Sequence, residues 1–266
     1  MTTGRNIGGG QESGKQQRGG EFGAHALIML YNSGVRKGLL ALVLLATSWF
    51  AAAYQSAPGT HPVTGRKIAG VMGMNGADWL VRPEREAEEQ PEKAIDALNL
   101  KPGNVVADIG AGVGYMTLRM ARRVGPNGKV YANDLQPQML ELLRQNAAKA
   151  GLGNIVTVQG EVADPKLPAN TMDLVLLVDV YHEFSQPQVM LRKIRETLKP
   201  DGRLVLLEYR AEDPNVPIIA EHKMTVAQVR TELEAEGFLL QPVIETLPRQ
   251  HLLILTKATA KATGAR

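Results

Sequence analysis

The chain has 266 residues and 44% of them are hydrophobic, enough for one large domain or two small ones with a sizeable core. Its net charge of +3 lies in residues 1–53, where five basic side chains face two acidic ones, and the other 25 basic and 25 acidic residues balance, so no basic surface for nucleic acid is predicted. The absence of cysteine excludes disulfides, cysteine-ligated zinc and a thiolate nucleophile.

The first 53 residues have the composition of a leader. Residues 1–28 are rich in Gly, Gln and charge, which predicts disorder. Residues 29–53 hold Arg36 and Lys37, an apolar run and three alanines, the pattern of a secretory signal peptide. A membrane anchor is the alternative, although the run is shorter than the roughly 20 residues of a spanning helix. Either way we expect a protein exported to the periplasm or anchored facing it, with membrane contact only through this segment; a cytoplasmic protein is the alternative.

The next segment leads into the main domain. Residues 54–80 are rich in Gly and Pro and are predicted as an extended lead-in, followed by a domain over 81–257 and a flexible tail over 258–266. Residues 84–98 have helical character. Before and within this helix, Trp79, Arg82 and Arg85 are candidates for a lid over a bound ligand, with surface salt bridges as the other role for the arginines.

Residues 105–115 carry the strongest signal of the chain. An apolar run containing Asp108 is followed by Gly110, Gly112 and Gly114, and then by helix-forming residues over 116–124. This pattern predicts a buried strand, a turn at which the backbone approaches a ligand closely, and a helix start. A dinucleotide fingerprint would need its last glycine at position 115, which is Tyr115.

Strands and helices then alternate with short connections. The predicted strands and helices after the glycine motif are strands 129–134, 155–161, 172–179 and 203–208, and helices 138–150 and 187–198. A capping box of Thr225 and Gln228 predicts one more helix, which Gly237 would end. Strands over 238–243 and 251–256 follow it. The alternation predicts an α/β fold with a parallel sheet between helices and a C-terminal antiparallel hairpin.

These motifs together resemble a known enzyme family. The compact G-x-G-x-G, with an acidic residue two places before it, resembles motif I of class I S-adenosylmethionine (SAM) dependent methyltransferases. The segment Gly160–Asp173 and the turn Leu198–Gly202 resemble the ubiquinone/menaquinone-type, methyltransferase-11-like branch. The resemblance covers residues 91–257. It implies a Rossmann-like, doubly wound, seven-stranded, mostly parallel sheet, SAM as the cofactor, and transfer of its methyl group to a small-molecule acceptor.

The resemblance also implies which residues hold the cofactor. Asp108 would anchor the methionine end through the loop, and Asp134, at the end of its strand, would hold the ribose hydroxyls. Asp179 would contact the methionine portion or the acceptor. The remaining implied contacts are the loop backbone at Gly110, Ala111, Gly112 and Gly114, adenine packing by Leu135, the adenine amino group for Glu161, and a backbone contact from Val162.

Catalytic chemistry is predicted just after the strand that ends at Asp179. Tyr181, His182 and Glu183 offer proton acceptors there, and His182 is suited as a base by its pKa. Its plainer roles are to cap the following helix or to satisfy a buried partner. Residues 208–210 and 222–224 are further candidates for the acceptor pocket. No metal-ligand spacing such as H-E-x-x-H occurs, so no metal site is predicted.

Two other function classes stay open at this point. One is a non-catalytic SAM- or nucleoside-binding protein of the same fold, and the other is a spermidine-synthase-like aminopropyl transferase. An adenine-N6 or cytosine-N4 nucleic-acid enzyme is disfavoured because residues 179–182 are Asp-Val-Tyr-His instead of Asn/Asp-Pro-Pro-Tyr. The sequence does not identify the acceptor atom or the oligomeric state.

Overall fold

The computed structural model describes residues 59–258. The leader predicted over 1–28, the signal or anchor over 29–53 and all but the first residue of the predicted tail lie outside the described residues. Within 59–258, no helix combines the length and the apolar character needed to cross a bilayer.

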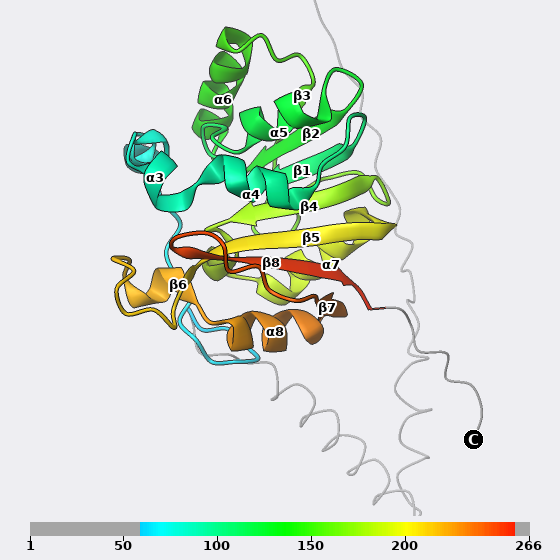
Figure 1. Cartoon of the computed structure of the whole chain (residues 1–266). Coiled ribbons are helices and arrows are strands. Elements are labelled where there is room, and N and C mark those ends of the chain that lie inside the picture. The colour runs from blue at the N-terminus through cyan, green and yellow to red at the C-terminus, as the bar shows by residue number, and fades with distance from the viewer. Residues whose placement is uncertain (1–58, 259–266) are drawn as a thin grey trace, which may run out of the picture. The chain divides into compact units, whose positions relative to one another are not determined.

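A single mixed sheet organises the described residues (Figure 1). The strands are β1 (Val105–Ile109), β2 (Lys129–Asp134), β3 (Ile155–Gln159), β4 (Met172–Val178), β5 (Leu198–Arg210), β6 (Lys223–Met224), β7 (Phe238–Leu240) and β8 (Gln250–Lys257). Their order is β3-β2-β1-β4-β5-β8-β7, with β6 beside the end of β5. Strands β1 to β5 run parallel, and β8 is antiparallel to both β5 and β7. The predicted doubly wound sheet with a C-terminal antiparallel hairpin is confirmed.

Helices cover both faces of this sheet because its central strands are apolar on both sides. The helices are α3 (Arg85–Glu89), α4 (Pro91–Leu98), α5 (Thr117–Val124), α6 (Pro137–Lys149), α7 (Pro187–Thr197) and α8 (Val226–Glu234). Along β4, Leu174 and Leu176 pack in one core with residues of α4 and α5. Val175 and Leu177 point the other way and pack in a second core with residues of α7 and α8. Packed helices therefore cover both faces of the sheet. In such sheets ligands bind at the carboxyl ends of the parallel strands, so a ligand site is expected there.

The helix predicted over 84–98 is divided in two. Gln90 has φ 51° and separates α3 from α4, because a residue before proline is disfavoured in the helical conformation. The turn predicted over 198–202 lies within β5, where it interrupts the register with β4 between Met172 and Leu174. The predicted capping box at the start of α8 is confirmed, with Thr225 and Gln228 bonded reciprocally.

The described part of the segment expected as an extended lead-in, residues 59–80, is folded onto the domain, and its first five residues lie outside the described residues. A bridge between Thr60 and Lys67 forms a small loop, and two 3-10 turns, η1 (Met74–Gly76) and η2 (Trp79–Val81), follow. The Arg66 guanidinium bonds the fully buried Glu232 of α8 at 2.9 Å and the carbonyl oxygen of His182 at 3.0 Å. A buried ion pair is favourable only when its geometry is good and its other hydrogen bonds are made. Through Arg66, residues 59–80 therefore contact both α8 and the turn that follows β4.

Candidate active site

A cavity of about 640 Å³ lies at the carboxyl edge of the sheet. Residues at or just beyond the ends of β1, β2, β4 and β5 form its floor, and residues 68–85 cover it. Its lining includes Ile68, Val71, Met72, Trp79, Leu80, Val180, Pro217, Ile218 and Ile219. The volume suits a ligand of cofactor size, and the apolar wall with a few polar groups is typical of small-molecule sites.

The glycine loop approaches this cavity with its backbone. Gly110 has φ 72°, and a Cβ there would lie 2.4 Å from Cγ2 of Val180. Gly112 has φ 52°, and a Cβ there would lie 2.9 Å from Cδ1 of Leu80. Both glycines line the cavity, and their missing side chains let Val180 and Leu80 pack directly against the loop backbone at the cavity wall.

Asp134 ends β2 at the same edge. Its Oδ2 accepts the backbone N–H of Gly112 at 2.9 Å, and its Oδ1 accepts that of Gln136 at 2.9 Å. Burial raises the pKa of this carboxyl, while the two N–H donors partly offset that effect. A carboxylate has about four acceptor positions, so two remain for the hydroxyls of a ribose. The glycine cradle and this carboxylate fit SAM.

Asp108 lies beneath the loop and does not line the cavity. It is 2% exposed, and its Oδ2 accepts the hydroxyl of Thr117 at 2.5 Å. Burial raises the pKa of Asp108 to about 6, against the hydrogen bond from Thr117. The side chain thus connects β1 to the first residue of α5 from below.

The other predicted cofactor residues divide into two groups. Leu135 and Val162 line the cavity together with the glycines and Asp134. Ala111 and Gly114 do not line it, and neither does Glu161, whose carboxylate pairs with Lys166 at 3.2 Å. Glu161 is exposed and lies outside the cavity lining, and its contact with the adenine amino group stays a prediction.

Asp179 lines the cavity just past the end of β4 and has an unusual environment. Its φ is 54°, a left-handed conformation that non-glycine residues adopt rarely. Gln250 donates Nε2 to Oδ2 of Asp179 at 2.8 Å, whereas the buried Oδ1 has no hydrogen-bond partner within residues 59–258. Burial, then the charges of Glu89 and Glu208, raise its pKa well above the ordinary value. A donor or cation from a ligand would satisfy this oxygen.

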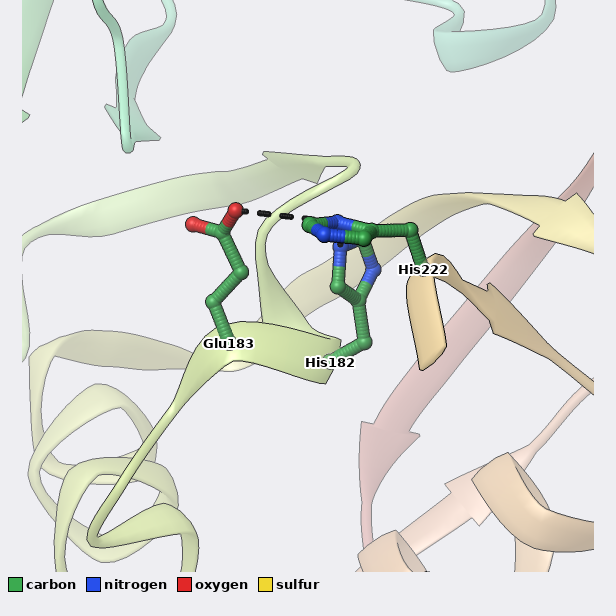
Figure 2. Close-up of side chains that lie close together, drawn as sticks. All are labelled: His182, Glu183 and His222. Atoms are coloured by element: carbon green, nitrogen blue, oxygen red, sulfur yellow. Dashed lines mark hydrogen bonds and ion pairs between the residues drawn. The ribbon is translucent and has the colours of Figure 1, made fainter. Parts of the chain in front are cut away.

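Two histidines meet beside Asp179. Figure 2 shows His182 and Glu183, from the 3-10 turn η3 (Tyr181–Glu183), and His222, which ends η4 (Ala220–His222). Nδ1 of His182 lies 2.6 Å from Oε2 of Glu208, and its Nε2 lies 3.0 Å from Nδ1 of His222. Burial, the largest single effect, lowers the pKa of His182, but the charge and hydrogen bond of Glu208 and the charges of Asp179 and Glu183 together outweigh it, so the pKa is raised. Burial raises the pKa of Glu183 to about 7.

Tyr181 is not part of this group. Its side chain is fully buried, its hydroxyl lies 3.2 Å from Nε2 of His61, and its ring packs edge-on against Phe184. The tight turn of η3 sends Tyr181 into the core while His182 and Glu183 face the cavity. The structure thus contradicts the prediction of Tyr181 as a catalytic group in contact with ligand.

Several cavity residues had weak or no sequence signal. The lid candidates Trp79, Arg82 and Arg85 all line the cavity, as does His222. The Arg82 guanidinium stacks 3.7 Å above the Trp79 ring, and Arg85 bonds Glu89 at 2.7 Å. Further lining residues that the motifs did not indicate include Ala69, Glu89, Asn133 and Met139, whereas Tyr209 belongs to the segment 208–210 that was a candidate for the acceptor pocket. They come from segments separated in sequence, so only the fold could bring them together.

The sheet order, the glycine loop and the carboxylate after β2 define a class I SAM-dependent methyltransferase, with SAM as its cofactor. The family model described as a methyltransferase domain matches residues 100–247, more than half of the chain. The chain therefore belongs to this methyltransferase domain family, which confirms the predicted enzyme class and cofactor. Neither the non-catalytic alternative nor the aminopropyl transferase is favoured by the match.

Relatives and solved structures agree with this assignment. The chain is 33% identical over 128 residues to a ubiquinone/menaquinone biosynthesis C-methyltransferase of Ectopseudomonas mendocina, covering 48% of this chain and 49% of that protein. The corresponding protein of Hahella chejuensis is also 33% identical, with 48% and 51% covered. The chain spans about half the length of the curated relatives it matches. The crystal structure of a SAM dependent methyltransferase from Aquifex aeolicus is 26% identical with a TM-score of 0.66, covering 71% of this chain and all of that one.

Proposed function

We propose that this protein transfers the methyl group of SAM to a small apolar acceptor, of the phenol or quinol type. One observation carries the proposal: a single cavity joins the glycine loop and Asp134 to the cluster of His182, Glu183 and His222. A cofactor on the glycine loop and an acceptor against the imidazoles would share that cavity. SAM supplies a methyl group on a cationic sulfur, which a nucleophile of the acceptor attacks in line.

The protein's part is to position the two molecules and to exclude water. Asp134 and the loop backbone would hold the nucleoside, and the buried Oδ1 of Asp179 would accept a hydrogen bond from the methionine portion or from the acceptor. The cluster of His182, Glu183 and His222 would position the acceptor oxygen and assist the loss of its proton. Since the sulfonium is already reactive, alignment is the larger contribution.

The mouth of the cavity supports an apolar acceptor. Several large apolar side chains that line it are at least one-third exposed, which is unusual for groups that gain by burial; they are Val71, Met72, Trp79, Val162 and Ile219. An apolar ligand would cover them. The curated relatives, named for C-methylation in ubiquinone and menaquinone biosynthesis, point to the same acceptor chemistry.

Calorimetric titration of the full chain with SAM and with S-adenosylhomocysteine tests the cofactor site. We expect micromolar binding that Asp134→Ala weakens about 100-fold, because the charge-assisted hydrogen bonds it removes are worth about 1.5–3 kcal/mol each. Asp201→Ala, an exposed aspartate in the turn within β5, is the matched control and should bind as the wild type. A folded chain that binds neither ligand would refute the proposal.

The acceptor requires a second experiment. Mass spectrometry of reactions with phenols, quinols and amines should show a gain of one methyl group on a phenol or quinol only. A product formed from amines alone would retain methyl transfer and overturn the acceptor class.

We also propose that residues 29–53 direct export of the protein. Arg36, Lys37 and the apolar run that follows support this, whereas synthesis of SAM in the cytosol stands against it. A reporter enzyme fused to residues 1–60 should appear outside the cytosol. A soluble cytosolic reporter would contradict export and leave the enzyme assignment untouched.

A further inference from the structure

Three side chains able to bind a metal ion converge on one wall of the cavity. His182, Glu183 and His222 each offer one ligand atom, and these atoms lie within 4.8 Å of one another (Figure 2). Among the described residues, 59–258, this is the one set of three His, Cys, Asp or Glu residues that meets this spacing. All three side chains line the cavity.

The hydrogen bonds around His182 prepare its ring for this role. Nδ1 of His182 lies 2.6 Å from Oε2 of Glu208, so when the ring donates to this oxygen, Nε2 is the nitrogen left to bind an ion, and Nε2 faces His222. Glu208 is itself fully buried, and its Oε1 accepts the backbone N–H of Tyr181 at 3.0 Å. A carboxylate that orients the second nitrogen of a histidine is the usual outer support of a metal ligand.

His182 is fixed from its backbone as well. Its carbonyl oxygen accepts both the backbone N–H of Ala69, at 3.1 Å, and Nη1 of Arg66, at 3.0 Å. His182 is only 1% exposed, whereas Glu183 and His222 are half-buried and line the cavity. The cluster thus has one rigid member and two that can adjust.

The distances suit a cation after small shifts. Zinc–nitrogen bonds of about 2.0–2.1 Å place tetrahedral ligand atoms roughly 3.3 Å apart. The observed separations are 3.0 Å between Nε2 of His182 and Nδ1 of His222, and 3.9 Å from that Nδ1 to Oε1 of Glu183. They lie on either side of the tetrahedral value, and three protein ligands leave a further position free.

We propose that His182, Glu183 and His222 bind one divalent transition-metal ion, whose free position faces the cavity and takes an oxygen atom of the acceptor. Two imidazoles and one carboxylate select the zinc-like ions over magnesium and calcium, which prefer oxygen ligands. The placement of the acceptor rests on the proposed function, whereas the binding of the ion does not. The competing account is a hydrogen-bonded chain Glu208–His182–His222 with one proton between the two imidazoles and no ion.

Metal titration of the tag-free full chain separates the two accounts. After treatment with a chelator, the protein should take up one equivalent of Zn²⁺, melt at a higher temperature with it, and give visible absorption bands with one equivalent of Co²⁺. His222→Ala and Glu183→Gln should each weaken uptake at least 100-fold. Glu208→Gln should weaken it 10- to 100-fold through the orientation of His182.

His251→Gln is the matched control. Both ring nitrogens of His251 are close to carboxylates, Nδ1 to Glu245 at 2.7 Å and Nε2 to Glu212 at 2.9 Å, and it is not a cavity residue. This variant should bind Zn²⁺ like the wild type. Glu183→Gln keeps the size of the side chain and one acceptor oxygen while it removes the negative charge, so it decides the question even where His222→Ala fails to fold.

The outcomes distinguish this site from the proposed function. Absence of stoichiometric Zn²⁺ or Co²⁺ uptake at micromolar concentration, or uptake that Glu183→Gln and His222→Ala leave unchanged, overturns the metal site. A SAM titration on the same metal-free sample then tests the enzyme separately. SAM binding without metal uptake would refute the metal site and remain consistent with the proposed function. Metal uptake without SAM binding would refute the proposed function and support the metal site.

Discussion

Replacing Asp108 by asparagine should stabilise the protein at neutral and basic pH. This carboxyl is 2% exposed, and burial raises its pKa from 3.8 to about 6. A raised pKa means that the folded state binds the proton more tightly than the unfolded state does. Below about pH 4 the carboxyl is protonated in both states and does not change the unfolding free energy. Between pH 4 and 6 the carboxyl ionises first in the unfolded state, so the unfolding free energy falls. Above pH 6 the full destabilisation by the buried charge is present.

The magnitude follows from the two pKa values. One pKa unit corresponds to about 1.36 kcal/mol, so the ionised side chain destabilises the fold by about 3 kcal/mol at pH 8 and by under about 1 kcal/mol at pH 4. Asparagine carries no charge and matches the shape. Its Oδ1 can accept from the Thr117 backbone, and its amide can donate to the Thr117 hydroxyl, which reverses its own bond.

Urea denaturation of wild type and Asp108→Asn at pH 4 and pH 8 measures this effect. We expect the variant's advantage in unfolding free energy to grow by roughly 2 kcal/mol between the two values, while Asp201→Asn, an exposed control, shows no such growth. SAM binding should weaken about 10-fold in Asp108→Asn, because the charge beneath the loop favours a cationic ligand. A variant less stable than the wild type at pH 8, or an advantage independent of pH, would refute the argument.

Three further predictions follow from the same packing. Gly110→Ala should lower stability by about 1–3 kcal/mol and abolish SAM binding, because its Cβ would lie 2.4 Å from Val180 and its backbone is in the left-handed region. Thermal unfolding and calorimetry measure the two effects, and a Tm and an affinity equal to those of the wild type would contradict the prediction. Arg66→Ala should destabilise by about 3–5 kcal/mol in chemical denaturation, since it leaves the buried Glu232 without its cation; a change under about 1 kcal/mol would show the pair to be dispensable. Burial lowers the pKa of His61 to about 4, so the unfavourable contribution of this one side chain grows as pH falls from 6.5 toward 4, and His61→Gln should gain unfolding free energy relative to the wild type over that range. A difference between the two proteins that does not change with pH would contradict this.

The cofactor half of the site was predictable because its signals are local. Gly110 and Gly112 are in one loop, and Asp134 ends a strand whose hydrophobic run is visible in the sequence. In a doubly wound sheet the carboxyl ends of neighbouring strands meet, so the strand order alone brings these residues to one edge. The same logic placed Asp179 correctly at the cavity.

The acceptor half was only partly predictable, because its geometry depends on contacts distant in sequence. His182 and Tyr181 are adjacent, and the local sequence does not indicate which of the two side chains faces the cavity. The orientation of Tyr181 depends on a contact distant in sequence, since its hydroxyl meets His61 in the core. Glu208 supports His182 only because β5 lies beside β4. His222 is 40 residues from His182, far outside the spacings by which a metal motif is recognised.

The unsatisfied atoms of Asp179 and Gln250 connect the two halves. Asp179 combines a left-handed backbone with a buried oxygen that has no partner among residues 59–258, and Oε1 of its neighbour Gln250 has none there either. Each feature destabilises the fold by about 1–3 kcal/mol, and packing alone would favour an apolar pair. The charge of Arg85 lowers the pKa of Asp179, whereas that of Glu208, whose Oε2 lies 2.6 Å from Nδ1 of His182, raises it. A ligand that donates to Asp179 would therefore relieve the same carboxylate crowding that acts on the histidine cluster, so we expect ligand binding at Asp179 and protonation of that cluster to depend on each other.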